Sequence, residues 1–239
     1  MKDTERIYSQ HTSKQYNDEL GKLRSDFLEM GELVEKQIRD ALDSLLTQDK
    51  QLAEGVLALD RRTNDYERQI DRDCTQIIAL RQPAAIDLRL IISISRALVD
   101  LERIGDEATR IAKQTLDLVN SESGTRGLQE IRHIGELVGE MFNLVLQAFA
   151  SSDTELAYKV VKCDLKVDQE YQSAMRSLIT FMMEDSRAIS NVLKTIWALR
   201  SLERIGDHAC NLAEQVIYQV SGTDVRHMDT GEIKEVVRD

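Results

Sequence analysis

The sequence is dominated by an internal repeat. The six residues Leu-Glu-Arg-Ile-Gly-Asp occur at positions 101–106 and again at 202–207. The two hexapeptides lie 101 residues apart, whereas identical residues upstream of them lie 104 residues apart. The two copies therefore differ in length by three residues just before the hexapeptide. Such self-similarity over a long period indicates tandem copies of one structural unit. The identities around the hexapeptide are Ala97-Leu98 with Ala198-Leu199, Ala108 with Ala209, Ala112 with Ala213 and Gln114 with Gln215, and those upstream are 31–34 with 135–138, Leu52-Ala53 with Leu156-Ala157, Asp49 with Asp153 and Asp60 with Asp164.

Both copies have the composition of long helices. The chain of 239 residues contains eleven glycines and one proline, and 31% of its residues are charged, so few positions must interrupt a helix and many can cover its outer face. The fold class predicted is all-α, with two tandem three-helix bundles at 17–119 and 127–220. The helices expected are 17–47, 49–81, 84–119, 127–150, 152–184 and 186–220.

Several local signals support this division. Pro83 disfavours helix at the residue before it and can begin the next helix. Residues 120–127, Asn-Ser-Glu-Ser-Gly-Thr-Arg-Gly, form a cluster of turn residues and are the expected linker. The short connections predict antiparallel neighbours. The polar, weakly periodic segments 1–16 and 221–239 are expected to be mobile ends.

Charge and hydropathy exclude several classes of protein. A net charge of −11 disfavours nucleic acid as a partner, because binding to phosphates depends on Lys and Arg. No segment approaches the roughly 18 apolar residues of a membrane span, and the first twenty residues lack a signal-peptide core, so we expect a cytoplasmic protein without direct membrane insertion. The three scattered cysteines indicate neither disulfides nor a thiolate zinc site.

The repeated hexapeptide carries two carboxylates four residues apart, Glu102 with Asp106 and Glu203 with Asp207. A helical wheel places them on the outer, polar face, where a solvated surface remains one interpretation. Like charges at this spacing destabilise a helix slightly, so their retention in both copies favours a bound cation. The preceding helix of each copy has its own acidic stripe, which antiparallel packing could bring opposite: Asp60, Asn64, Glu67 and Asp71 in the first copy, Asp164 and Asp168 in the second.

Oxygen ligands of this kind suit Mg²⁺, Mn²⁺ or Ca²⁺, and iron where carboxylates bridge several ions. Along the face of the motif, the second copy continues with Asn211 and Glu214, whereas the first continues with Arg110 and Lys113. We therefore predict that the second copy is the better cation site. Arg103 and Arg204 stand beside these carboxylates on the polar side, and Arg204 has no carboxylate at i−3 or i+4 within its helix. We expect both arginines to bind a partner protein.

The segments RQPAAIDLR, LERIGDEATRIA, LERIGDHACNLAEQVIY and GTDVRH resemble the PhoU family of phosphate-signalling regulators, over about residues 17–228. The resemblance implies two three-helix repeats and metal binding at Glu102, Asp106, Glu203 and Asp207, with iron, Mn²⁺, Mg²⁺ or Zn²⁺. It implies a cytoplasmic, non-enzymatic regulator that couples the Pst phosphate transporter, through its ATPase subunit PstB, to a PhoR-like sensor histidine kinase and represses the phosphate-starvation response. We also expect a homodimer. A carboxylate-bridged metal enzyme, either an oxidase or a phosphatase, and a purely structural bundle are the alternatives.

Overall fold

A computed structural model describes residues 2–119 and 127–238, with side chains from residue 14 onward. Every element in this part of the chain is helical, which confirms the all-α class. The elements are α1 (Lys2–Thr47), α2 (Lys50–Arg81), α3 (Ala85–Val119), α4 (Leu128–Ser151), α5 (Thr154–Glu184), a short 3₁₀ turn η1 (Ser186–Ala188), α6 (Ile189–Ser221) and α7 (Thr230–Arg238). None of these helices is long and apolar enough to span a membrane.

Repeated aspartates begin the second helix of each copy. The Asp49 side chain accepts a hydrogen bond of 3.0 Å from the backbone N–H of Leu52 at the start of α2. Its counterpart Asp153 accepts bonds of 2.9 and 3.0 Å from the N–H groups of Glu155 and Leu156 at the start of α5. These N-caps satisfy donors that the first helical turn cannot pair, so their repetition explains why both helices begin at the equivalent residue.

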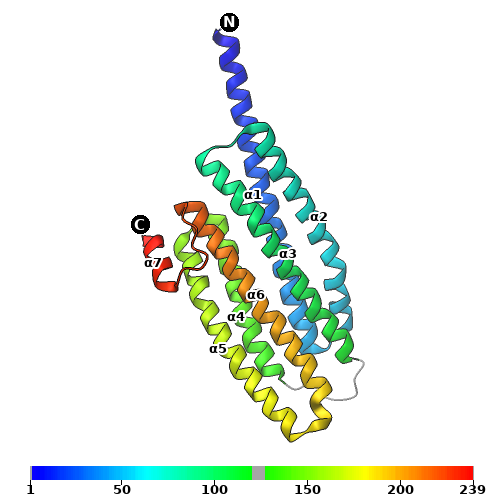
Figure 1. Ribbon diagram of the computed structural model, residues 1–239. Helices are drawn as coiled ribbons and strands as arrows, with labels where there is room; N and C mark the ends of the chain where they lie inside the picture. The colour runs from blue at the N-terminus through cyan, green and yellow to red at the C-terminus, as the bar shows by residue number, and fades with distance from the viewer. Residues whose placement is uncertain (1, 120–126, 239) are drawn as a thin grey trace.

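The six long helices form two three-helix bundles that lie side by side (Figure 1). Helices α1, α2 and α3 pack together, as do α4, α5 and α6, and buried apolar side chains from all six helices belong to one hydrophobic core. The two bundles meet through α3 against α6 and α1 against α4, with both pairs antiparallel (Figure 1). Helices α2 and α5 therefore lie at the outer sides.

Equivalent residues of the two copies make equivalent contacts across this interface. A Cβ atom on Gly31 of α1 would lie 2.5 Å from Leu146 of α4, and one on Gly135 of α4 would lie 2.7 Å from Leu42 of α1. Gly31 and Gly135 are equivalent in the two copies, and so are Leu42 and Leu146. Reciprocal contacts of this kind define a twofold relation, so the two halves are related by a pseudo-twofold axis, and the absence of a side chain at each glycine permits the close approach.

Both ends of the chain contain helix. Helix α1 begins at Lys2, and its N-terminal part extends beyond the bundle as a continuation of the same helix (Figure 1). After α6 ends at Ser221, with Gly222 as its C-cap, the chain turns back and forms α7, which packs mainly on α5. Val225 and Ile233 are 1% and 2% exposed, so apolar burial holds this segment in place. Helix α7 has only nine residues, so its helical pattern of apolar positions at Ile233, Val236 and Val237 is too short to stand out in the sequence. Most of the expected linker, residues 120–126, lies outside the described residues.

Candidate metal centre

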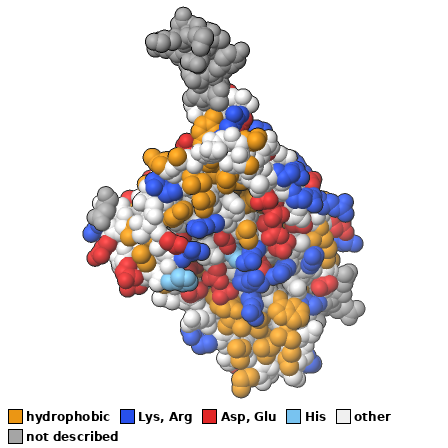
Figure 2. Space-filling model, turned by 45° about the horizontal axis from the view of Figure 1, so that its top comes forward, with side chains coloured by type: hydrophobic (Ala, Val, Ile, Leu, Met, Phe, Trp, Pro, Cys, Tyr) orange, Lys and Arg blue, Asp and Glu red, His pale blue; other side chains and the backbone are white. Residues whose placement is uncertain are grey.

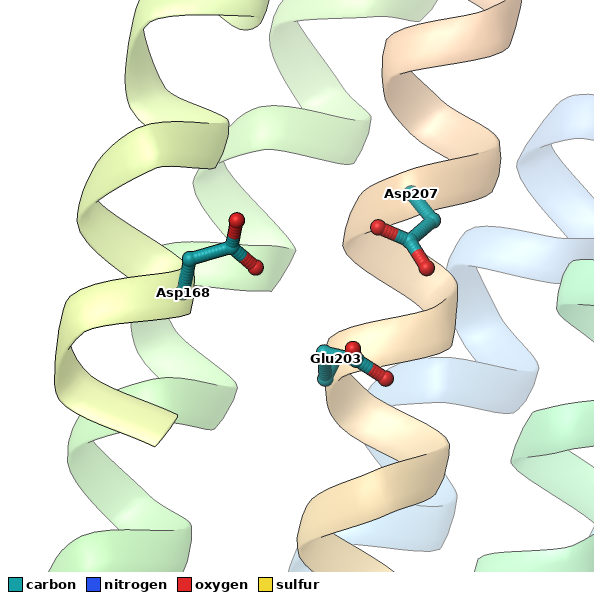
Figure 3. Close-up of side chains that lie close together, drawn as sticks. All are labelled: Asp168, Glu203 and Asp207. Carbon is teal, nitrogen blue, oxygen red and sulfur yellow. The ribbon is translucent and has the colours of Figure 1, made fainter. Parts of the chain in front are cut away.

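Three carboxylates meet between α5 and α6 in the second copy. Asp168 projects from α5 toward Glu203 and Asp207 on α6 (Figure 3). One oxygen from each residue lies within 4.8 Å of the others, a separation that a single cation could bridge. Among the described residues, this is the one group of three or more such side chains with that geometry. The sequence had suggested all three residues, and the antiparallel packing of α5 on α6 brings them together.

The packing of α6 explains why the carboxylates face α5. Leu202 and Ile205 are fully buried on the opposite side of the same turn. Gly206 faces α5, where a Cβ atom would lie 3.4 Å from Oδ1 of Asp164 and 3.5 Å from Val167. These are ordinary van der Waals distances, so Gly206 marks where the backbone of α6 lies beside the acidic side of α5.

Burial and the nearness of other carboxylates make the negative charge of these side chains unfavourable. Burial, and secondarily the charge of Asp207, raises the pKa of Glu203, and burial followed by the charge of Asp168 raises the pKa of Asp207. Burial also raises the pKa of Asp164 to about 7, with Asp168 and Asp207 adding to the effect. The Oδ1 atom of Asp164 is buried without a hydrogen-bond partner. An orphaned carboxylate oxygen beside three more carboxylates fits a bound cation, which would satisfy both the oxygen and the charge.

The first copy has the corresponding residues but a looser arrangement. Burial, followed by the charge of Asp106, raises the pKa of Glu102, and burial followed by the charge of Asp71 raises that of Glu67. Asp60 accepts hydrogen bonds from Thr109 at 3.3 Å and from Asn64 at 3.4 Å. These residues influence one another, but their oxygens do not converge as those of the second copy do. The preference of a cation for the second copy stays a prediction, for which the convergence of three oxygens there is an argument.

Neither of the two residues given as the reason for that preference belongs to the group of three. Asn211 lies away from the cluster and donates a hydrogen bond of 3.0 Å to Asp100 of α3. Burial, followed by the charge of Asp224, raises the pKa of Glu214 to about 7, and Arg226 opposes this shift. The charge of Glu214 also contributes to the raised pKa of Asp164. Asp168 on the neighbouring helix, and neither residue further along α6, completes the group of three.

The structure gives the two repeated arginines different surroundings. Arg204 has a carboxylate partner outside its own helix, because its Nη1 lies 3.0 Å from Oε1 of Glu107 on α3. Glu107 is only 2% exposed and also accepts from Ser201 of α6 at 2.9 Å and pairs with Arg110 at 2.5 Å. Sequence reasoning considered partners only within the helix, and so missed Glu107. The position of Glu107 on the buried side of α3 was the feature of the sequence that could have indicated a partner in another helix. Arg103 is exposed and no described carboxylate forms an ion pair with it.

The counterpart of the Glu107 contact completes the pseudo-twofold relation. His208 occupies the position of Glu107 in the second copy, and Asp100 occupies that of Ser201 in the first. The Nδ1 atom of His208 lies 2.8 Å from Oδ1 of Asp100. The same pair of positions is thus joined on both sides of the α3/α6 interface, by different side chains.

Comparisons with known proteins agree with this architecture. The family model described as the PhoU domain matches residues 27–115 and 131–216, once in each copy. The phosphate-specific transport system accessory protein PhoU homolog of Pseudomonas aeruginosa is 54% identical over 227 residues, covering 95% of this chain and 94% of that protein. The phosphate-specific transport system accessory protein PhoU of Escherichia coli (strain K12) is 40% identical over 229 residues, covering 96% and 95% of the two chains.

Solved structures give the same result. The crystal structure of PhoU from P. aeruginosa superposes with a TM-score of 0.85 at 54% identity, covering 87% of this chain and all of that one. The phosphate transport system regulatory protein PhoU from Streptococcus pneumoniae superposes with a TM-score of 0.81 at 30% identity, covering 88% of this chain and 99% of that one. The similarity extends over both copies and nearly the full length of each relative. The chain belongs to the PhoU family.

Proposed function

We propose that this protein is a cytoplasmic regulator of inorganic phosphate homeostasis that acts on the phosphate-specific transport system without catalysis of its own. The observation that carries the proposal is the similarity, over 95% of the chain, to a protein named as an accessory of that system. The proposed partners are the PstB ATPase subunit of the transporter and a PhoR-like sensor kinase, through which the protein represses the starvation response. The proposal includes a homodimer, which light scattering of the purified protein tests.

Cation binding at Asp168, Glu203 and Asp207 is part of the proposal, with Asp164 as a further ligand. An all-oxygen donor set fits Mn²⁺, Mg²⁺ or iron better than Zn²⁺, whose sites are built mainly from Cys and His. A bound cation supplies positive charge. The chain's own contribution is to hold carboxylates from two helices within reach of one ion, so that occupancy links α5 to α6. The names of the relatives, accessory and regulatory proteins, favour this role over that of an oxidase or phosphatase.

Deletion of the gene in its own organism tests the regulatory proposal. Loss of a repressor should raise alkaline phosphatase output while phosphate is plentiful, and the wild-type gene should restore the low level. A variant with Asp168→Asn, Glu203→Gln and Asp207→Asn asks whether the carboxylates contribute, with Glu102→Gln and Asp106→Asn as the matched control. Unchanged output after deletion would contradict the proposed function. Full repression by the triple variant would separate regulation from cation binding.

A further inference from the structure

The exposed face of α6 carries an apolar stripe at its N-terminal end. Ile189, Leu193 and Trp197 are 40%, 37% and 53% exposed, although they are large hydrophobic residues. They follow one another at intervals of four residues and so share one face, over about 12 Å of helix. Figure 2 shows an apolar patch at this lower end of the molecule, with basic side chains above it. Contiguous apolar surface rimmed by charge is typical of an interaction site.

The stripe leads into a basic groove on the α3/α6 interface. The groove has a volume of about 210 Å³, and its lining includes Trp197, Arg200 and Arg204 of α6 with Arg110 of α3. The buried Glu107 is the one carboxylate among the lining residues. In a chain with a net charge of −11, this concentration of arginine is a local reversal of sign. Together the stripe and the groove extend over about 22 Å of α6, from Ile189 to Arg204.

Glu107 holds two of the arginines in place. Its Oε1 atom lies 2.5 Å from Arg110 and 3.0 Å from Arg204, and the carboxylate itself is 3% exposed, whereas the two arginines are 51% and 42% exposed. The guanidinium groups are therefore fixed from beneath while part of each remains open to solvent. Fixing a long side chain in advance reduces the entropy lost when a partner binds. Arg200 is exposed and forms no ion pair among the described residues, although its charge opposes the raised pKa of Glu203.

The pseudo-twofold counterpart of this groove lies near the segment that follows α6, and its side chains differ from those of the groove. Arg96 occupies the position of Trp197 in the first copy, and its guanidinium lies 5.3 Å from the centre of the Tyr218 ring. Arg226 hydrogen bonds hold the pKa of Asp224 at about 2, and the charge of Arg96 contributes to lowering it. Val225, beside that aspartate, is buried. On this side, the chain's own segment after α6 supplies a carboxylate next to an apolar residue.

We propose that the surface formed by Ile189, Leu193, Trp197, Arg110, Arg200 and Arg204 docks an acidic amphipathic segment of a partner protein. Apolar side chains of that segment cover the stripe on α6, and its carboxylates bind the arginines of the groove. Exposed Trp and Arg are the residue types that contribute most to protein interfaces, and bidentate pairing with carboxylates favours Arg over Lys. The extended stripe exceeds what a small anion would contact. This surface lies on the α3 side of α6, whereas the carboxylate cluster faces α5, although the charges of Arg200 and Arg204 reach Glu203.

A displayed library of random peptides of about 15 residues, enough to run along 22 Å as a helix, tests the chemistry of the partner. Peptides are selected on the wild-type protein, and their affinities are measured by the fluorescence of Trp197, the single tryptophan of the chain. We expect selected peptides to combine Asp or Glu with apolar residues and to shift Trp197 emission to shorter wavelength. Arg200→Ala, which leaves the Glu107 pairs intact, should weaken them about tenfold. The control Arg61→Ala, an exposed arginine of α2, should not.

Three outcomes would overturn the proposal. Selected peptides without carboxylates, or peptides that bind Arg200→Ala as tightly as wild type, would remove the arginines from the interface. Displacement of the peptides by excess inorganic phosphate at constant ionic strength would identify a small-anion site. A Trp197 shift that depends on protein concentration alone and accompanies dimer formation would assign the surface to a second copy. None of these outcomes bears on the phosphatase phenotype of the gene deletion, so the two proposals can fail separately.

Discussion

Arg204 of α6 forms a 3.0 Å ion pair with Glu107 of α3, and so joins the two halves of the molecule at a buried carboxylate. The arginine belongs to the same helical turn as Glu203 and Asp207 of the candidate metal centre. One turn of α6 therefore presents carboxylates to α5 and a guanidinium to α3. This arrangement gives the arginine a structural role in addition to its place in the proposed docking surface.

We expect Arg204→Ala to destabilise the protein by about 1 kcal/mol, because it removes one ion-pair partner of the buried Glu107 carboxylate, while the partial exposure of the guanidinium limits the loss. The matched control is Arg103→Ala, its equivalent in the first copy, which is exposed and should change the free energy of unfolding by no more than about 0.5 kcal/mol. Urea unfolding monitored by circular dichroism measures both. Equal effects of the two substitutions would mean that the Glu107 pair contributes nothing.

The two acidic clusters should differ in cation affinity. We expect Glu203→Gln with Asp207→Asn to reduce Mn²⁺ affinity by at least about tenfold, and Glu102→Gln with Asp106→Asn to reduce it less, because the three oxygens converge in the second copy. Asp168→Asn alone should also weaken binding strongly, since it removes the ligand supplied by α5. Calorimetric titration measures the Mn²⁺ affinity of each variant. Equal losses of affinity in the two double variants would contradict the predicted difference between the two clusters.

Stability should depend on pH through Asp164. The pKa of this residue in the folded protein is about 7, against 3.8 for an ordinary aspartate. Between these values the folded state holds a proton that the unfolded state releases, so the stability present below about pH 4 is lost as the pH rises toward 7. In the presence of a chelator, Asp164→Asn should therefore melt above the wild type at about pH 8 and show a smaller difference at about pH 5.

With added Mn²⁺, the wild-type protein should instead melt above Asp164→Asn. Wild-type protein is stabilised by any cation that binds the folded state alone, and the variant has lost one proposed ligand. Melting curves at both pH values, with chelator and with Mn²⁺, make the comparison. A variant that melts below wild type in chelator at about pH 8 would show that charged Asp164 is not a source of instability.

Replacement of glycine by alanine should destabilise the protein where α1 meets α4 and stabilise it at an open position of α2. Gly31→Ala would place a Cβ atom 2.5 Å from Leu146, which is only 8% exposed and has little room to move. We expect a cost of about 1–3 kcal/mol. Gly55→Ala in α2 meets nothing within 4 Å and should stabilise the protein by about 0.5–1 kcal/mol, because alanine loses less backbone entropy. Thermal unfolding of the two variants checks the sign of each effect.

Much of the fold could be predicted because its signals are local. The break at Pro83 lies within a few residues of the helix ends that it determines, and the structure adds N-caps at Asp49 and Asp153 that act over the same short range. The meeting of Asp168 with Glu203 and Asp207 followed from antiparallel neighbours within one copy. A helical wheel, however, shows which face of a helix is polar and not which distant helix covers that face. The partners of Arg204 and Asn211 both lie on α3, in the other half of the chain, and therefore could not be predicted in this way.

The pseudo-twofold interface between α3 and α6 has a consequence for the independence of the halves. If the first half paired with an identical copy of itself along the same interface, Glu107 would meet Asp100 twice, and each contact would oppose two carboxylates. The second half paired with itself would place His208 against Ser201. Neither homodimer of halves recovers the bonds that join Glu107 to Ser201 and Asp100 to His208. The molecule is in effect a heterodimer carried on a single polypeptide, in which substitutions on one side of the interface must be matched on the other.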